Sequence, residues 1–382
     1  MYFRINKKII FILLTIILLS NSSCKTVRII REVFLPKETD YKVFPYRTIE
    51  RDTVAHIFPV IRREAVDIGR RILLDNRPVT PSAETLDIFS KKHKNMAFII
   101  LRNDSILYET YRKGMNEATT MTSFSAAKAF VSTLVGIAIS EKYIGSEQDY
   151  ITKYLPELHN KGYDSIRIEH LLNHTSGIRY DPGLFTTNGN YDFYWRRNLR
   201  EHTFHLAVEN KPGVKFRYLN VNTQLLGLII ERATHQTMSH YLQEKIWKPL
   251  GMESSGSWST DEKGKRGIEK AFCCINARAR DFARFGQLYL QNGVWNGKQI
   301  VPAAWINKSI HGAPSAGGRR TYRYNWGIAP RKYGSFYAIG LYGQFIYVYP
   351  EKNIVIVRFG KRDLNYNPSY WAQIMLQLCD QL

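Results

Sequence analysis

Acidic residues are scarce in this sequence, which has 33 Asp and Glu against 54 Lys and Arg and a formal net charge of +21. A basic surface can attract nucleic acid, anionic lipid or acidic polymers. The cations are spread in pairs such as Arg62-Arg63 and Arg319-Arg320, without a long Lys/Arg block and without the ligand spacing of a zinc site. We therefore expect a basic, solvated surface, no nucleic-acid partner, no metal and no cofactor.

Cysteine is also rare, at four residues: Cys24, Cys273, Cys274 and Cys379. If Cys24 is modified, as argued below, an odd number remains. Cys273 and Cys274 are neighbours in the sequence, and adjacent side chains are poorly placed to bridge one another. We therefore expect no structural disulfide, even in an oxidising compartment.

The N-terminal apolar run is short. It covers residues 9–19, follows three basic residues and precedes small residues that end at Cys24. A bilayer span needs about 20 apolar residues, whereas this pattern is typical of a secretory signal peptide. The cysteine after small residues resembles a bacterial lipoprotein cleavage site. We expect residues 1–24 to be a lipoprotein signal and Cys24 to be lipidated, which would give an exported, membrane-anchored protein facing the periplasm or cell exterior. An uncleaved anchor and an ordinary signal peptide remain alternatives.

The rest of the chain has the composition of a globular protein, with 44% hydrophobic and 23% charged residues and no internal repeat. Residues 25–90 contain Pro-containing turns and basic segments, and residues 61–74 have apolar side chains at helical spacing. We expect residues 25–90 to form an N-terminal arm that is helical in part. Residues 91–382 are then left for the main domain.

Strand-like runs lie at both ends of that domain, around a mostly helical middle of about residues 140–330. Residues 96–101 and 106–111 flank a turn and predict a hairpin. We expect an α/β (α+β) fold in which strands from both termini form one sheet flanked by helices, with the helical region inserted. The other expected strands are 336–339, 344–349 and 354–359, and the expected helices are 130–139, 166–173, 221–233, 279–292 and 368–382.

A possible nucleophile occurs in the motif Ser125-Ala-Ala-Lys128, which opens an apolar run. If a helix starts near Ser123 or Ser125, with either residue as its N-cap, Ser125 and Lys128 share one face at about 5–6 Å between β-carbons. A hydroxyl nucleophile and its general base need that geometry. The motif alone is not specific, because residues 22–25 match the same pattern within the leader.

Two further features accompany this motif. Tyr218-Leu-Asn220 is the only Tyr-x-Asn in the chain, and it follows a Pro-Gly loop. A phenol beside a Ser/Lys pair can relay a proton to a leaving group, and an asparagine can donate to a substrate carbonyl. Residues 340–346 read as a strand with internal glycines, where a ligand can approach the backbone and N–H groups can form an oxyanion hole.

This order of Ser-x-x-Lys, Tyr-x-Asn and a glycine-bearing C-terminal strand resembles the serine β-lactamase/penicillin-binding-protein superfamily. Within it, Tyr-x-Asn is similar to the class C β-lactamase branch, which includes DD-peptidases, family VIII esterases and 6-aminohexanoate-dimer hydrolases. The resemblance covers roughly residues 90–380 and implies a β-lactamase/transpeptidase-like antiparallel sheet. Other matching stretches are residues 171–177, 212–218, 247–252 and 277–288.

The resemblance implies roles for particular residues. Ser125 would be the nucleophile, Lys128 its base, Tyr218 the proton relay and Asn220 a substrate-positioning donor. The backbone N–H groups of Ser125 and Gln344 would form the oxyanion hole. His174 lies in a family motif, but Ser/Lys chemistry does not need a histidine, so we expect a structural role for it.

One departure from the family pattern bears on the substrate. Where β-lactamases and DD-peptidases carry Lys-Thr-Gly, this chain aligns Leu341-Tyr342-Gly343. Losing a charge-assisted hydrogen bond to a substrate carboxylate costs about 1.5–3 kcal/mol. Arg319, Arg320 and Arg323 are candidate replacement cations.

We therefore expect a carboxylesterase or a 6-aminohexanoate-dimer-hydrolase-like amidase, acting on a small-molecule or peptide-like ester or amide. Tyr342, Gly343 and Gln344 would bind the substrate. Three alternatives stay open: a β-lactamase or D-Ala-D-Ala carboxypeptidase, a catalytically inert penicillin-binding-like sensor, and a purely structural lipoprotein.

Overall fold

The computed structural model describes residues 35–61, 67–68, 73–74, 77–78, 84–179, 189–329, 334–362 and 367–382. The expected signal peptide and Cys24 lie outside the described residues. The chain divides after Lys37, and the account below concerns the unit Glu38–Leu382. Within the described part of the chain, no helix is both long and apolar enough to cross a membrane.

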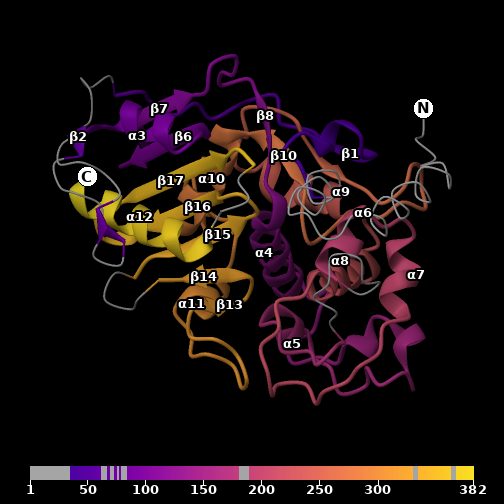
Figure 1. The fold of residues 1–382 in the computed structure, drawn as a ribbon. Helices are drawn as coiled ribbons and strands as arrows, with labels where there is room; N and C mark the ends of the chain where they lie inside the picture. Colours follow the sequence, from indigo (N-terminus) through magenta and orange to yellow (C-terminus); the bar gives the residue numbers. More distant parts are fainter. Residues whose placement is uncertain are drawn as a thin grey trace, which may run out of the picture. The chain divides into compact units, whose positions relative to one another are not determined.

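Strands from both ends of the chain form one antiparallel sheet, as expected. Its seven strands run in the order β13-β14-β15-β16-β17-β6-β7, and Ile356 of β17 pairs with Ile100 of β6. Figure 1 shows β6 and β7, from early in the chain, beside the late strands β16 and β17. The strands are β6 (Asn95–Arg102), β7 (Ser105–Tyr111), β13 (Tyr322–Arg323), β14 (Trp326–Ile328), β15 (Phe336–Gly340), β16 (Gln344–Tyr349) and β17 (Ile354–Gly360).

Helices cover both faces of this sheet because its central strands are apolar on both faces. In β17, Ile354 and Ile356 point into a core with α12 (Pro368–Gln381) and α3 (Leu86–Lys92). Val355 and Val357 alternate with them and point into the larger core on the other face, which includes α10 (Ala279–Leu290). Because successive side chains of a strand point to opposite faces, β17 contributes side chains to both cores.

The inserted region contains most of the helices but is not purely helical. A second antiparallel sheet, in the order β1-β9-β10-β8, joins a strand from early in the chain to strands of the middle region, and Thr48 of β1 pairs with Ser257 of β9. Its strands are β1 (Tyr46–Ile49), β8 (Thr120–Thr122), β9 (Gly256–Ser259) and β10 (Ile275–Arg278). The helices are α4 (Ala127–Ser140), α5 (Ile168–Leu172), α6 (Asn190–Trp195), α7 (Leu199–Phe204), α8 (Asn220–Thr234), α9 (Met238–Leu242) and α11 (Ala303–Ile310).

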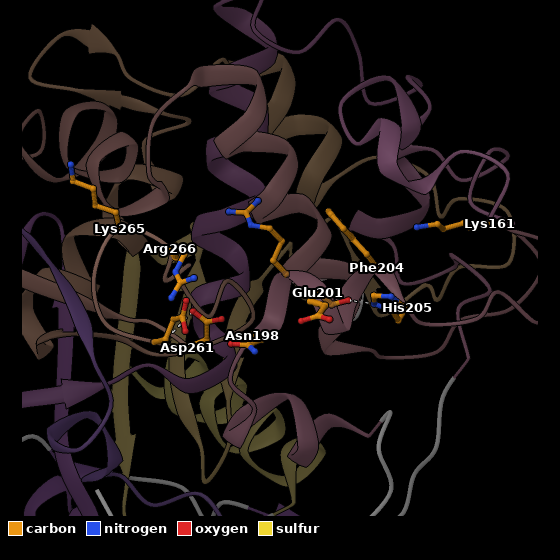
Figure 2. A pocket seen from close by; sticks show the side chains of 10 residues that line it. Lys161, Asn198, Glu201, Phe204, His205, Asp261, Lys265 and Arg266 are labelled. Carbon is orange, nitrogen blue, oxygen red and sulfur yellow. Dashed lines mark hydrogen bonds between the residues drawn. The ribbon is translucent and has the colours of Figure 1, made fainter. Parts of the chain in front are cut away.

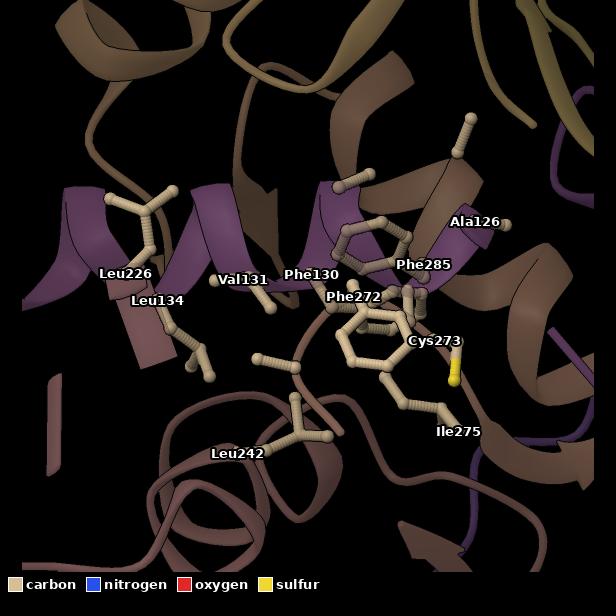
Figure 3. Packing of buried hydrophobic residues seen from close by; sticks show 14 of the residues in the cluster. Ala126, Phe130, Val131, Leu134, Leu226, Leu242, Phe272, Cys273, Ile275 and Phe285 are labelled. Carbon is tan, nitrogen blue, oxygen red and sulfur yellow. The ribbon is translucent and has the colours of Figure 1, made fainter. Parts of the chain in front are cut away.

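Helix α4 lies inside the core, and nearly all of its residues are buried. The ring of Phe130 stacks on Phe285 of α10 at 3.6 Å between centroids. Figure 3 shows the apolar side chains that surround α4 on several sides. An apolar helix of this kind is rigid at its start, where the Ser/Lys motif lies.

Two expectations about local structure are wrong. In residues 61–74, the described pieces Asp67–Ile68 (β2) and Leu73–Leu74 (β3) are short strands, paired with Glu84–Thr85 (β5) and Arg77–Pro78 (β4). Cross-strand pairing there overrides the helical spacing. Residues 340–346 are not one strand, since β15 ends at Gly340, β16 starts at Gln344, and the three residues between them form a turn.

The expectation of no structural disulfide is also wrong, because Cys273 and Cys274 are bonded to each other. Cys274 has a φ of +72°, a left-handed conformation in which the chain turns sharply between the two residues. Sequence spacing implies an ordinary extended or helical peptide and does not reveal such a turn. Cys379 is a buried free thiol.

Candidate active site

Ser125 sits in a tight turn that leads into α4. Phe124–Ala126 forms a single 3-10 turn, and α4 itself begins at Ala127. The expected capping role of Ser123 is wrong, because its hydroxyl donates to the carbonyl of Phe124 and accepts from the N–H of Ile275 at 3.0 Å. The turn is thereby attached to β10, and Ser125 stays only half-buried.

Lys128 is enclosed, with 1% of its surface exposed. Its Nζ lies 3.1 Å from Ser125 Oγ, 3.0 Å from Asn220 Oδ1 and 2.8 Å from the carbonyl oxygen of Phe272. A neutral amine has two N–H bonds and one lone pair. The amide oxygen of Asn220 and the carbonyl of Phe272 can only accept, so they take the two N–H bonds, and the lone pair faces the Ser125 hydroxyl.

Burial favours this neutral state. The pKa of Lys128 is lowered well below 10.5 by removal of the amine from water. No carboxylate is among its hydrogen-bond partners to stabilise the ammonium form. The arrangement therefore gives a serine hydroxyl beside an amine that can accept its proton.

Tyr218 and Asn220 reach the pair from the start of α8. Asn220 is the first residue of that helix, and the Tyr218 hydroxyl hydrogen-bonds Ser125. The Tyr218 ring also lies 4.8 Å from Lys128 Nζ. Burial raises the pKa of Tyr218 to about 12, so at neutral pH the phenol holds its proton and is a donor, not a base.

His174 supports Tyr218, and among the described residues the structure shows no direct contact between His174 and Ser125. Its ring stacks on Tyr218 at 4.7 Å between centroids, and its Nδ1 accepts from the N–H of Leu219 at 3.0 Å. That bond assigns the ring proton to Nε2, which lies 3.1 Å from Asn325 Oδ1. Burial, then the charge of Lys128, lowers the pKa of His174 to about 3, so it stays neutral.

The far wall is the end of β15 and the turn after it. A Cβ atom at Gly340 would lie 2.3 Å from the carbonyl oxygen of Ser123, so β15 passes directly against the turn that contains Ser125. The strand positions there are Ala338, Ile339 and Gly340, which offer no hydrogen-bonding side chain. The expected alignment of Lys-Thr-Gly with Leu341-Tyr342-Gly343 is therefore wrong, because these three residues form the turn after β15. The strand positions at the end of β15 contain no lysine or threonine either.

The three predicted substrate-binding residues of this wall differ in their surroundings. Tyr342 is buried edge-on against Phe124, with 5.7 Å between ring centroids. Arg358 donates to the carbonyl oxygens of Tyr342 and Gly343, at 3.1 and 2.7 Å. The Gln344 side chain forms two hydrogen bonds with the backbone of Gly360. Gln344 thus reaches the site only through its backbone.

Sequence reasoning missed several groups around Ser125. The Phe272 carbonyl is a backbone atom and has no side-chain signature. Tyr194 lies 6.3 Å from Phe124 between ring centroids and donates to Asp40 Oδ2 at 3.1 Å. Tyr322 stands edge-on to Tyr218 at 5.8 Å. These aromatic side chains come from distant segments, and only the fold brings them together.

A separate cavity lies elsewhere in the insertion. Figure 2 shows this hollow of about 910 Å³, lined by charged side chains that include Lys161, Glu201 and Arg266 and none of the residues around Ser125. Its Asp261 carboxylate accepts from the N–H groups of Leu199 and Ile268 at 2.8 Å each. It holds no Ser/Lys pair. Among the residues that the structure describes, no group of three or more His, Cys, Asp or Glu side chains could hold a metal.

Comparison with known proteins identifies the family. The Beta-lactamase family model matches residues 82–377. The chain belongs to this family. Both the predicted serine β-lactamase/penicillin-binding-protein superfamily and the predicted fold are therefore confirmed.

The most informative relatives are hydrolases. A curated 6-aminohexanoate-dimer hydrolase of Paenarthrobacter ureafaciens is 26% identical over 283 residues, covering 69% of this chain and 71% of that protein. A solved structure assigned as a 6-aminohexanoate-dimer hydrolase of Bacillus anthracis has a TM-score of 0.77 at 24% identity, over 92% of this chain and 93% of that one. A family VIII carboxylesterase structure has a TM-score of 0.60 at 16% identity, over 78% and 95%. At these identities the two structures show the shared fold alone.

Proposed function

We propose that this beta-lactamase-family protein is a serine hydrolase that cleaves an ester or amide bond through an acyl-enzyme. The observation that carries the proposal is the buried Lys128 amine, whose Nζ lies 3.1 Å from Ser125 Oγ. The relatives assigned as 6-aminohexanoate-dimer hydrolases support the finer reading of a class C-like esterase or amidase.

In the proposed reaction Ser125 Oγ attacks the substrate carbonyl carbon while Lys128 Nζ accepts the hydroxyl proton. Tyr218 protonates the leaving alcohol or amine and is reprotonated from Lys128. Water then attacks the acyl carbon, and the proton path runs in reverse to restore Ser125. Positioned acid–base groups contribute about 10²–10⁴-fold each.

The oxyanion would be stabilised by backbone N–H groups. The candidates are those of Ser125, at the start of the turn into α4, and Gln344, which pairs across the hairpin with Gly340. Asn220 binds Lys128 through Oδ1, so its N–H₂ group is the part that would meet a substrate carbonyl.

The surroundings of Ser125 favour an uncharged substrate group. Phe124, Tyr342 and Tyr194 supply aromatic surface, and β15 has neither lysine nor threonine where it passes the nucleophile. A β-lactamase or D-Ala-D-Ala carboxypeptidase needs a cation for the substrate carboxylate. Among the three arginines considered as replacement cations, Arg319 is the one that the structure supports. Its guanidinium lies over the Phe216 ring. The Phe216 ring contacts Tyr322, which in turn contacts Tyr218.

The place of action is proposed from the sequence. Export and lipid anchoring through Cys24 would bring the hydrolase to a membrane surface that faces the periplasm or the cell exterior. We also propose, from the sequence alone, that the chain divides into an arm of residues 25–90 and a domain of residues 91–382.

The test compares hydrolysis of p-nitrophenyl butyrate and nitrocefin by the full chain and its Ser125→Ala variant. We expect ester turnover that is lost in the variant, and no nitrocefin turnover. Nitrocefin turnover that depends on Ser125 would establish the β-lactamase instead. An intact protein that turns over neither compound and is not labelled by a fluorophosphonate probe would be an inert sensor.

A further inference from the structure

The Cys273–Cys274 disulfide lies in a segment that contacts both Lys128 and the residue before Ser125. The preceding residue, Phe272, accepts the Lys128 hydrogen bond on its carbonyl oxygen at 2.8 Å. The N–H of Cys274 donates to the carbonyl of Phe124 at 3.3 Å, and Phe124 immediately precedes Ser125. Figure 3 shows Phe272 and Cys273 beside the start of α4. One short segment thus contacts both the base and the nucleophile turn.

The same segment is fixed to the second sheet on its other side. Trp258 Nε1 donates to the carbonyl of Cys273 at 2.8 Å, and the N–H of Ser259 donates to the carbonyl of Cys274 at 3.1 Å. Both donors belong to β9. The segment that holds the disulfide therefore connects β9 to the Ser125 turn and to Lys128.

The backbone of this segment is in an uncommon conformation at Cys274. Cys274 holds a φ of +72°, which residues other than glycine adopt rarely. Closing a ring with Cys273 limits the alternatives open to this peptide. If the ring opens, the segment can relax toward ordinary backbone angles, and the Phe272 carbonyl and the Cys274 N–H move with it.

We propose that the Cys273–Cys274 disulfide is a positioning element for Lys128 and Ser125, and that its reduction lowers the hydrolytic activity. This inference rests on the proposed function. Reduction by a dithiol transfers two electrons and two protons to the disulfide. It yields the two cysteine thiols and leaves the reductant as its own cyclic disulfide.

The burial of both cysteines limits how fast the disulfide can be reduced. Cys273 and Cys274 are 3% and 2% exposed, so an attacking thiolate reaches them only when the segment opens. Reduction should therefore be slow in the folded protein, and substitution is the cleaner perturbation. Cys379 is buried in the core between the seven-stranded sheet and α12, and serves as the matched control.

The experiment compares the full chain with the double variant Cys273→Ala/Cys274→Ala and with Cys379→Ala, using p-nitrophenyl butyrate over a range of pH. We expect the double variant to lose about tenfold or more in kcat, because small misplacements of reacting groups are costly. Its kcat/KM should also rise at a higher pH than that of the wild type. A looser segment admits water to Lys128, which brings the pKa of the amine back toward its ordinary value. Cys379→Ala should match the wild type in both respects.

Two further measurements keep the test decisive. The wild-type peptide that holds Cys273 and Cys274 should be two hydrogen atoms lighter than after reduction, and equal masses would overturn the proposal. Hydrogen exchange in residues 123–128 and 271–276 should be faster in the double variant whether or not the ester is a substrate. A wild type that hydrolyses no ester and is not labelled by a fluorophosphonate probe would therefore refute the proposed function, whereas unchanged exchange would refute the positioning role.

If the alanine pair does not fold, Cys273→Ala/Cys274→Gly supplies the same comparison, because glycine adopts a φ of +72° freely. Without the covalent ring, glycine also leaves many other backbone angles open to the segment, so this variant should fold, lose kcat and show the rise of kcat/KM at a higher pH than the wild type. A variant without the disulfide that keeps the wild-type kcat and pH profile would show that the covalent link does not position the pair.

Discussion

The role of Tyr218 leads to a prediction about leaving groups. Because burial raises the pKa of this phenol to about 12, it keeps its proton through the neutral range. A protonated phenol beside Ser125 is suited to protonate a departing alkoxide or amine. A p-nitrophenolate ion leaves without a proton. Tyr218→Phe should therefore discriminate between substrates by the basicity of the leaving group.

The magnitude follows from what the substitution removes. The ring stays, so its stacking on His174 at 4.7 Å and its contact with Lys128 are kept. Only the hydroxyl and its bond to Ser125 are lost, which costs about 1 kcal/mol of stability. For an alkyl ester or an amide, losing the acid should lower kcat/KM, which reports the acylation step, about 10²–10⁴-fold, or about 3–5 kcal/mol in activation free energy. For p-nitrophenyl butyrate the loss should be about tenfold or less.

The assay measures kcat/KM for an alkyl butyrate and for p-nitrophenyl butyrate with both proteins, because kcat would include hydrolysis of the butyryl-enzyme that the two esters share. Tyr322→Phe is the matched control, since it removes a neighbouring hydroxyl that lies near His174 Nε2 and Asn325 and that, in the described part of the chain, hydrogen-bonds to neither Ser125 nor Lys128. It should leave the ratio of the two rates unchanged. An equal loss on both esters in Tyr218→Phe would refute the proton-donor role and point to general loss of the site.

Two further predictions concern buried lysines. Only neutral Lys128 accepts a proton, so kcat/KM should rise with pH through its pKa and then level off, at a lower pH than an ordinary lysine would give. Asn220→Asp places an anion beside the amine and should move this rise upward by about 1–3 pH units, and a rise that stays in place would contradict the assignment of Lys128 as base. Lys270 is buried, donates to the carbonyl of Arg196 at 3.2 Å, and has its pKa lowered by burial to about 7. Between that pKa and 10.5 the unfolded state binds the additional proton, so the wild type should gain stability with rising pH by about 1.4 kcal/mol per unit, relative to Lys270→Met. Denaturant unfolding of both proteins between pH 6 and 10 measures the difference, and parallel curves would show that the amine is solvated.

Features that depend on short spacing could be predicted from the sequence. Ser125 and Lys128 lie three residues apart, and the start of α4 brings them within hydrogen-bond distance. The continuous apolar runs in β6 and β17, and the apolar spacing in α8 and α10, also predicted their elements within a few residues. Local periodicity suffices in these segments because burial of one or both faces reinforces it.

Features that depend on long-range contact could not be predicted in this way. The carbonyl of Phe272 approaches Lys128 from far along the chain, and a backbone acceptor has no sequence signature. Because β15 and β16 pair as a hairpin, residues 341–343 form the turn between them. The end of β15, and not residues 341–343, therefore lies against the Ser125 turn. The left-handed backbone at Cys274, set by contacts on both sides of the segment, decided that adjacent cysteines form a disulfide.

The sequence by itself therefore determined which residues could do the chemistry: a hydroxyl, an amine and a phenol in the order of a known family. The tertiary structure alone decided their chemical states. Burial removes water from Lys128 and Tyr218 and lowers the pKa of the first while raising the pKa of the second. Solvent exclusion is a property of the packed whole, because it depends on atoms from many distant segments that surround each group.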